Sequence, residues 1–183
     1  MSRPLRVAWF SLFDTAPCGG ESLSSYVSRM LLPGLRNDID VELFGEAEGA
    51  FCGFDVSPFL TAFRRHREAP FDIFFYQFED TSRAAFVRAH LGLMPGVVWF
   101  HDFFLTSDGP EPLLNSPWEE TVGKFNDPDR AWPDKARKYV RLKPQAWREG
   151  GLALVPVFSS MRDHDEYRRI VTERLREEGA RSW

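Results

Sequence analysis

The sequence predicts an α/β fold: one mostly parallel sheet with helices on both of its faces. Three observations predict it. Short apolar runs typical of strands buried on both faces recur along the chain, among them 5–12, 71–78 and 96–100. Segments with apolar residues at helical spacing separate these runs. Strands that alternate with helices of this length are joined by right-handed parallel crossovers, which place the helices against the sheet.

The first elements are a strand, a glycine-containing loop and a helix. We predict the strand at Leu5–Leu12 and the helix over Leu23–Leu31, with Ser22 as its N-cap and Pro33-Gly34 at its end. A second short strand is expected at Val41–Phe44.

The same alternation continues to residue 101 and makes the first hundred residues look Rossmann-like. The expected elements are a short helix with Phe59 and Phe63 that Pro70 closes, a strand at Phe71–Phe78, a helix capped by Thr81 or Ser82 that carries Ala85, Phe86 and Ala89, and the run Gly96–Phe100 that leads to His101.

From residue 103 to 151 the periodicity is lost. Six prolines interrupt this segment, and three tryptophans lie among its charged residues. We interpret 103–151 as an irregular Pro/Trp-rich excursion within the same domain, of the kind that often serves as a functional loop or lid. Regularity returns with an expected strand at Leu152–Phe158, and a charged helix follows Ser159-Ser160 and ends near Gly179-Ala180.

Length and composition bound the function classes. With 183 residues, 43% of them hydrophobic, the chain is expected to form one Rossmann-like domain over residues 1–183, without room for a second, nucleotide-binding domain. A net charge of −4 gives no broad basic field, so nucleic acid is disfavoured as a partner. Few cysteines and a start without a signal-peptide core favour the cytoplasm. No run approaches the about 20 apolar residues that cross a bilayer, so any membrane contact is expected to be peripheral.

The most informative feature is His101-Asp102, which follows the strand-like run ending at Phe100. Open α/β sheets hold their ligands at strand ends. A titratable ring beside a carboxylate suits acid/base chemistry near neutral pH, so His101 and Asp102 are the candidate catalytic residues. The alternative is a loop in which the two side chains only make local hydrogen bonds.

A second candidate is the loop between the first strand and the first helix. Backbone N–H groups and the positive end of the helix can bind an anion there, and Gly19 and Gly20 permit close backbone approach. Together with Glu21 they are the candidate substrate-binding residues, with a plain turn as the alternative. Because the loop lacks the dinucleotide fingerprint and the Walker pattern, neither a nicotinamide cofactor nor ATP is expected.

Several other motifs favour structural interpretations. Asp127-Pro128-Asp129 is expected to form a turn, and the acidic residues of Asp163–Glu166 suit the first turn of a helix, so no metal site is predicted. His66 and His90 lie among arginines and are expected on the surface. Cys18, beside the glycines, is interpreted as a small loop residue.

Four segments together resemble the N-terminal half of a GT-B glycosyltransferase, and in particular the retaining family 4 enzymes. The resemblance spans residue 5 to about residue 170 and rests on Leu5–Leu12, Cys18-Gly19-Gly20, Phe71–Gln77 and Pro95–Leu105. In that family the glycine loop faces the phosphate or sugar of the donor, and the strand-end histidine faces the transferred sugar. The resemblance therefore implies that Gly19, Gly20 and His101 lie in the cleft, with Asp102 beside them.

The resemblance also implies a function. The chain would be the acceptor-side domain of a nucleotide-sugar-dependent glycosyltransferase of the hexosyltransferase type, inactive without a second domain or partner chain. The donor would be a nucleotide sugar, the acceptor a glycan, lipid or protein, and no metal would be obligatory. Such an enzyme would act in the cytoplasm, with peripheral contact to the inner face of a membrane left open. The alternative is a non-catalytic interaction module with a Rossmann-like or flavodoxin-like fold.

The family's second domain carries two glutamates separated by seven residues. Glu111 and Glu119 have that spacing, but they flank prolines in the irregular segment, and we interpret the match as coincidence.

Overall fold

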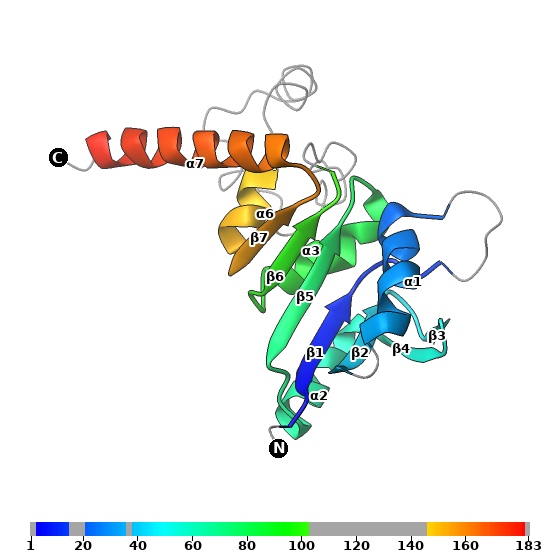
Figure 1. The fold of residues 1–183 in the computed structure, drawn as a ribbon. Helices are drawn as coiled ribbons and strands as arrows, with labels where there is room; N and C mark the ends of the chain where they lie inside the picture. Colours follow the sequence, from blue (N-terminus) through cyan, green and yellow to red (C-terminus); the bar gives the residue numbers. More distant parts are fainter. Residues whose placement is uncertain (1–2, 15–20, 36–37, 103–145, 182–183) are drawn as a thin grey trace.

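The computed structural model describes residues 3–14, 21–35, 38–102 and 146–181, and in these ranges the chain folds around one sheet (Figure 1). The sheet has seven strands in the order β3-β4-β2-β1-β5-β6-β7. Every neighbouring pair is parallel except β3 and β4, which are antiparallel. The predicted α/β class with a Rossmann-like, mostly parallel sheet is confirmed.

The strands are β1 (Leu5–Phe10), β2 (Ile39–Gly45), β3 (Gly49–Phe51), β4 (Phe54–Pro58), β5 (Ile73–Phe78), β6 (Val97–Phe100) and β7 (Val155–Phe158). The helices are α1 (Leu23–Leu35), α2 (Ala62–Glu68), α3 (Ala85–Leu91), α6 (Ala146–Leu152) and α7 (Met161–Arg181), with single 3₁₀ turns η1 (Phe59–Thr61) before α2 and η2 (Ser82–Ala84) before α3.

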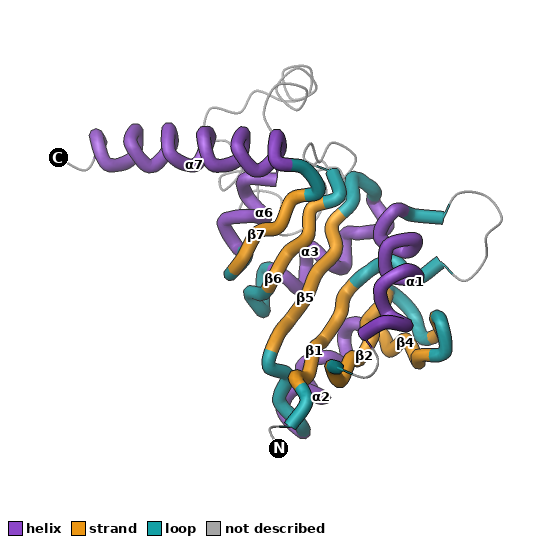
Figure 2. Tube along the Cα trace, in the orientation of Figure 1, coloured by secondary structure: helices purple, strands orange, loops and turns teal. Residues whose placement is uncertain are grey.

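Helices cover both faces of the sheet, α1 on one face and α2, α3 and α6 on the other (Figures 1 and 2). Successive strand residues point to opposite faces. Trp9 therefore packs with Leu32 of α1, whereas its neighbour Phe10 packs with Val87 and Leu91 of α3. The two buried clusters explain why the strands are apolar at consecutive positions.

The order of the strands makes β1 the point where the chain changes direction. The chain adds β2, β3 and β4 on one side of β1. It then returns and adds β5, β6 and β7 on the other side of β1. In open α/β sheets, the crevice outside the carboxyl ends of the strands at such a switch is the usual place for a ligand.

The β3–β4 hairpin was not predicted, and its turn explains why. Phe51 pairs with Phe54, so the turn has two residues, and both have positive φ: 52° at Cys52 and 77° at Gly53. A two-residue turn with two positive φ values is of the type that favours Asn-Gly or Asp-Gly. Cysteine in the first position removes that sequence signal.

Several boundaries also differ from expectation. Pro33 lies inside the last turn of α1, where Leu32 is fully buried and holds the helix against the sheet. Leu152 ends α6 and does not begin β7, and α6 forms the end of the segment expected to be irregular up to residue 151. Residues 103–145 of that segment lie outside the described ranges.

Within the described ranges, no helix is both long and apolar enough to cross a membrane.

Candidate functional site

Polar side chains gather where three strands end at the same edge of the sheet. Asp14 follows β1, Gln77 and Glu79 lie at the end of β5, and His101 and Asp102 follow β6. Because β1, β5 and β6 are parallel and adjacent, their carboxyl ends meet at the switch between β1 and β5.

Gln77 is the buried centre of this group. The indole Nε1 of Trp9 donates to Gln77 Oε1 over 3.0 Å, and the Ser28 hydroxyl of α1 donates to the same oxygen over 2.5 Å. An indole N–H can only donate, so the amide atom that faces Trp9 must be the oxygen. The amide nitrogen of Gln77 therefore faces the other way, toward His101.

His101 is held as a neutral ring with a defined tautomer. Gln77 Nε2 lies 3.1 Å from His101 Nε2. Since the amide nitrogen donates, His101 Nε2 must accept, and the proton of the neutral ring resides on Nδ1. Burial lowers the pKa of His101 to about 4, and the charge of Asp102 opposes this shift only in part. The sequence led us to expect a His101 ring that titrates near neutral pH. In the structure the ring is instead neutral at that pH and acts as a hydrogen-bond donor.

Asp102 serves the backbone beside the histidine. Its Oδ2 accepts the backbone N–H of Asp80 over 2.8 Å and so ties the end of β6 to the end of β5. Among the described residues, no hydrogen bond joins Asp102 to the His101 ring. On the strand that precedes them, the Trp99 ring lies 5.0 Å from the His101 ring, centroid to centroid.

The N-terminus of α1 is already occupied by side chains of this chain. Ser22 Oγ accepts the N–H of Ser25 over 3.2 Å, which confirms Ser22 as the N-cap. Asp14 Oδ2 accepts the N–H of Ser22 over 2.8 Å, and the buried Glu79 carboxylate accepts the N–H of Ser24. An incoming anion would have to displace two carboxylates from these donors, which disfavours the anion site expected here.

Arg83 of η2 forms an ion pair with Asp14. Burial on its own would raise the pKa of Asp14, but the Arg83 guanidinium and the hydrogen bonds from Ser22 outweigh it, and the pKa lies below its usual value. Asp14 is therefore ionised at neutral pH, and its charge neutralises that of Arg83.

Glu21 is held within the protein. Its Oε1 accepts from Arg29 Nε over 2.9 Å and from the Ser25 hydroxyl over 3.2 Å. The structure thus gives this candidate ligand residue a structural partner on α1. Gly19, Gly20 and Cys18 lie outside the described residues, and their proposed positions in the cleft stay predictions.

Sequence reasoning missed Gln77 and Glu79, although a signal was present. Gln77 is 1% exposed and interrupts an otherwise apolar run in the middle of the sheet. A buried polar side chain needs hydrogen-bond partners, so a glutamine within a central strand indicates a specific hydrogen-bond network inside the protein.

The expected surface position of His90 is wrong, because this residue is only 1% exposed. Its ring stacks on Phe10, with centroids 4.2 Å apart, and its Nδ1 lies 2.8 Å from the Tyr76 hydroxyl. That hydroxyl donates to the carbonyl of Met94 over 2.6 Å, so His90 Nδ1 is the donor to the tyrosine oxygen. Burial lowers the pKa of His90 to about 4. His66, by contrast, is half-buried and accepts the N–H of Phe71 over 3.0 Å.

Of the acidic residues in Asp163–Glu166, only Asp163 lies in the first turn of α7, and Ser160 Oγ caps the helix by accepting the N–H of Asp163 over 3.1 Å. In the described part of the chain, no three histidine, cysteine or acidic side chains are grouped so as to hold a metal ion. Asp127-Pro128-Asp129 lies outside that part.

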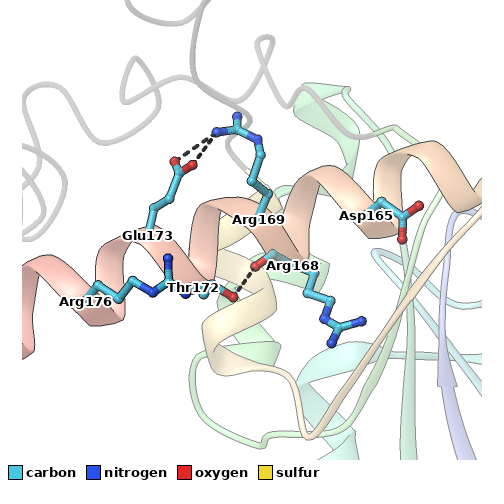
Figure 3. Close-up of a pocket in the computed structure, with 6 residues that line it drawn as sticks. All are labelled: Asp165, Arg168, Arg169, Thr172, Glu173 and Arg176. Atoms are coloured by element: carbon cyan, nitrogen blue, oxygen red, sulfur yellow. Dashed lines mark hydrogen bonds and ion pairs between the residues drawn. The ribbon is translucent and has the colours of Figure 1, made fainter.

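Farther along α7 there is an open hollow along one side of the helix (Figure 3). All six of its lining residues come from this single helix: Asp165, Arg168, Arg169, Thr172, Glu173 and Arg176. Arg169 forms ion pairs with Glu166 and Glu173, each one turn away. One helix face cannot enclose a ligand, so this hollow is a weaker candidate than the edge of the sheet.

Comparison of the chain with protein-family models, curated proteins and solved structures gave no match. The function must therefore be inferred from the residues at the sheet edge.

Proposed function

We propose that this chain is the acceptor-side domain of a GT-B-type glycosyltransferase that uses a nucleotide sugar and needs a second domain or partner chain for turnover. One observation carries the proposal: a neutral His101, held by the buried Gln77, stands at the carboxyl ends of the strands beside the switch point.

The chemistry of the edge suits a sugar better than a bare phosphate. Neutral histidine offers one N–H donor, and carboxylates accept from hydroxyl groups. Asp14 and Arg83 neutralise each other, so Glu79 and Asp102 contribute the negative charge at this edge. Negative charge at this edge disfavours a diphosphate, but it does not disfavour a neutral polyhydroxyl ring.

In this proposal each residue has a limited task. His101 Nδ1–H donates to a hydroxyl of the transferred sugar and holds it in position without removing a proton. Gln77 orients the ring and keeps its tautomer, and Asp102 fixes the loop that follows. The diphosphate would be held by positive groups outside this chain, so the isolated chain is expected to bind nucleotide sugars weakly and to transfer no sugar.

The test is an NMR titration of the ¹⁵N-labelled full chain with UDP-glucose, ADP-glucose and GDP-mannose. At least one donor should perturb the amides of Gln77 and His101, and His101→Ala should abolish that effect. His66→Ala is the matched control, because His66 bonds to Phe71 before β5 begins, at the amino ends of the strands. Perturbation confined to the amino ends of the strands, or none with any donor, would defeat the proposal, as would steady sugar transfer by the chain alone.

The second candidate is a non-catalytic interaction module. The observation in its favour is an exposed apolar row on the edge strand β7, where Val155 is 51% and Val157 37% exposed. Absence of donor binding together with concentration-dependent association through this row would favour that function.

A further inference from the structure

A hollow of about 220 Å³ lies beside the proposed sugar site, and it belongs to a different set of elements. It opens where β1 and β2 end and is completed by the β2–β3 turn, β4 and the start of α3. Complete small-molecule sites usually measure about 300–1,000 Å³. This hollow is smaller, so it suits one terminal group of a larger ligand.

The lining of the hollow is divided into an apolar part and a charged part. Phe13, Val56 and Phe86 supply apolar surface, and the last two are nearly buried. Glu46 and Glu48 supply carboxylates from the exposed turn between β2 and β3. A group that fits both parts carries an apolar or C–H-rich body and a polar end.

The charge of that polar end follows from the ion pairs. Arg83 also lines the hollow, but its charge is balanced by Asp14. Neither Glu46 nor Glu48 has a hydrogen-bond or ion-pair partner among the residues that the structure describes, whereas Glu21 and Glu42 are both paired with arginines. The hollow therefore has an uncompensated charge of about −2 on one side.

We propose that this hollow is a subsite for a protonated amine, with Glu46 and Glu48 as its acceptors and Phe13, Val56 and Phe86 as the seat of the attached ring or chain. The inference rests on the proposed function in one respect: it takes the amine to be a group of the sugar acceptor, so that the acceptor is an amino sugar or carries a comparable amine.

The test uses D-glucosamine, N-acetyl-D-glucosamine and D-glucose as probes, titrated at pH 6.5 into the ¹⁵N-labelled full chain. Glucosamine should perturb the amides of Gly45, Gly49 and Ala50, and the two uncharged sugars should not. Glu46→Gln and Glu48→Gln should each weaken glucosamine binding by up to about fivefold, the upper end for an exposed ion pair. The double variant should lose the response.

Asp55→Asn is the matched control, because Asp55 is an exposed carboxylate on β4 that does not line the hollow. It removes one negative charge nearby and should leave glucosamine binding unchanged. Equal responses to glucosamine and glucose, an unaffected double variant, or no glucosamine response would each overturn the inference.

The same samples separate this inference from the proposed function. A glucosamine response at the hollow without any nucleotide-sugar response at Gln77 and His101 would preserve the amine subsite and defeat the glycosyltransferase proposal. The opposite pattern would preserve the glycosyltransferase proposal and defeat the amine subsite.

Discussion

At the scale of single residues, the site depends on one amide group. Trp9 and Ser28 fix the orientation of the Gln77 amide, and the amide fixes the tautomer of the neutral His101 ring. A buried network in which each donor meets an acceptor has one arrangement, so it specifies chemistry as well as shape. Burial keeps the His101 ring neutral in spite of its neighbour Asp102, and the network leaves Nδ1–H as its donor.

The substitution Gln77→Glu tests this dependence. A carboxylate at position 77 would still accept from Trp9 and Ser28, but it would present an acceptor to His101 Nε2. We expect the pKa of His101 to rise from about 4 to above its usual value of about 6.5, because the charged ring gains an ionised partner. NMR titration of the ring protons measures this directly. An unchanged pKa would show that Gln77 does not control the ring.

The two histidines with lowered pKa values should make stability depend on pH. Burial lowers the pKa of His90 and His101 to about 4, so between pH 4 and 6.5 the unfolded chain binds more protons than the folded one. Their contribution is complete above about pH 6.5 and is lost as the pH falls toward 4. The slope of the unfolding free energy is at most about 1.4 kcal/mol per pH unit for each ring, and less for the partly exposed His101.

Urea unfolding at a series of pH values measures this slope. The variant with both His90→Gln and His101→Gln lacks the titrating rings and should show a much flatter profile over the same interval. A wild-type profile as flat as that of the variant would contradict the assigned burial.

At the scale of elements, the sequence predicts the regular parts well and the special turns poorly. The strands β1, β5 and β6 are marked by apolar runs, and α1 by its spacing and its cap Ser22. The β3–β4 hairpin has only short strands, and its turn lacks the residues that normally indicate one. Local patterns do not encode it, because β4 is held by pairing with β2, and β3 by pairing with β4.

The hairpin turn provides a stability test. Cys52 has φ 52°, a conformation that asparagine tolerates better than cysteine. Cys52→Asn should therefore stabilise the protein by about 0.5–1 kcal/mol. Cys52→Ser, which keeps the unfavourable conformation, is the control. A chemical denaturation curve in which Asn gains nothing over Ser would contradict the turn assignment.

The start of β6 requires glycine because of packing. A Cβ on Gly96 would collide with the carbonyl of Phe74 and come within 2.8 Å of the Tyr76 ring. Gly96→Ala should therefore destabilise the protein by about 1–3 kcal/mol, in the range of overpacked cores. Gly34→Ala is the matched control: a Cβ there meets nothing within 4 Å, and alanine favours the helix by up to about 1 kcal/mol. Thermal unfolding should show opposite signs for the two variants, and equal signs would count against the packing at β6.

At the scale of the whole molecule, the sheet brings together residues that are far apart in the sequence. Asp14, Gln77 and His101 come from three strands, and only the order β2-β1-β5-β6 makes them neighbours. From the sequence, strand ends could be predicted and so could His101 as a site candidate. The partners could not, because the contacts of Gln77 with Trp9 and Ser28 depend on which strands pair and on where α1 packs.

The dependence on tertiary packing also explains why the predicted exposure of His90 was wrong. Its neighbours in the sequence include Arg88, and this polar context favours exposure. Its place is decided by the packing of α3 on β5 and β1, where Tyr76 supplies a hydrogen-bond partner and Phe10 a stacking surface. A histidine on a helix can satisfy either environment, and only the tertiary contacts distinguish them.

The central claim is that the edge of the sheet binds the sugar part of a nucleotide sugar through a neutral His101. The most direct measurement is the pair of ¹⁵N chemical shifts of the His101 ring at pH 7, recorded without ligand, with UDP and with UDP-glucose, and repeated with GDP and GDP-mannose. We expect a ring with its proton on Nδ1 in every sample and a shift of the Nδ1 signal with a nucleotide sugar, but not with the matching nucleotide alone. A protonated ring, a proton on Nε2, or the same response to nucleotide and nucleotide sugar would contradict the account.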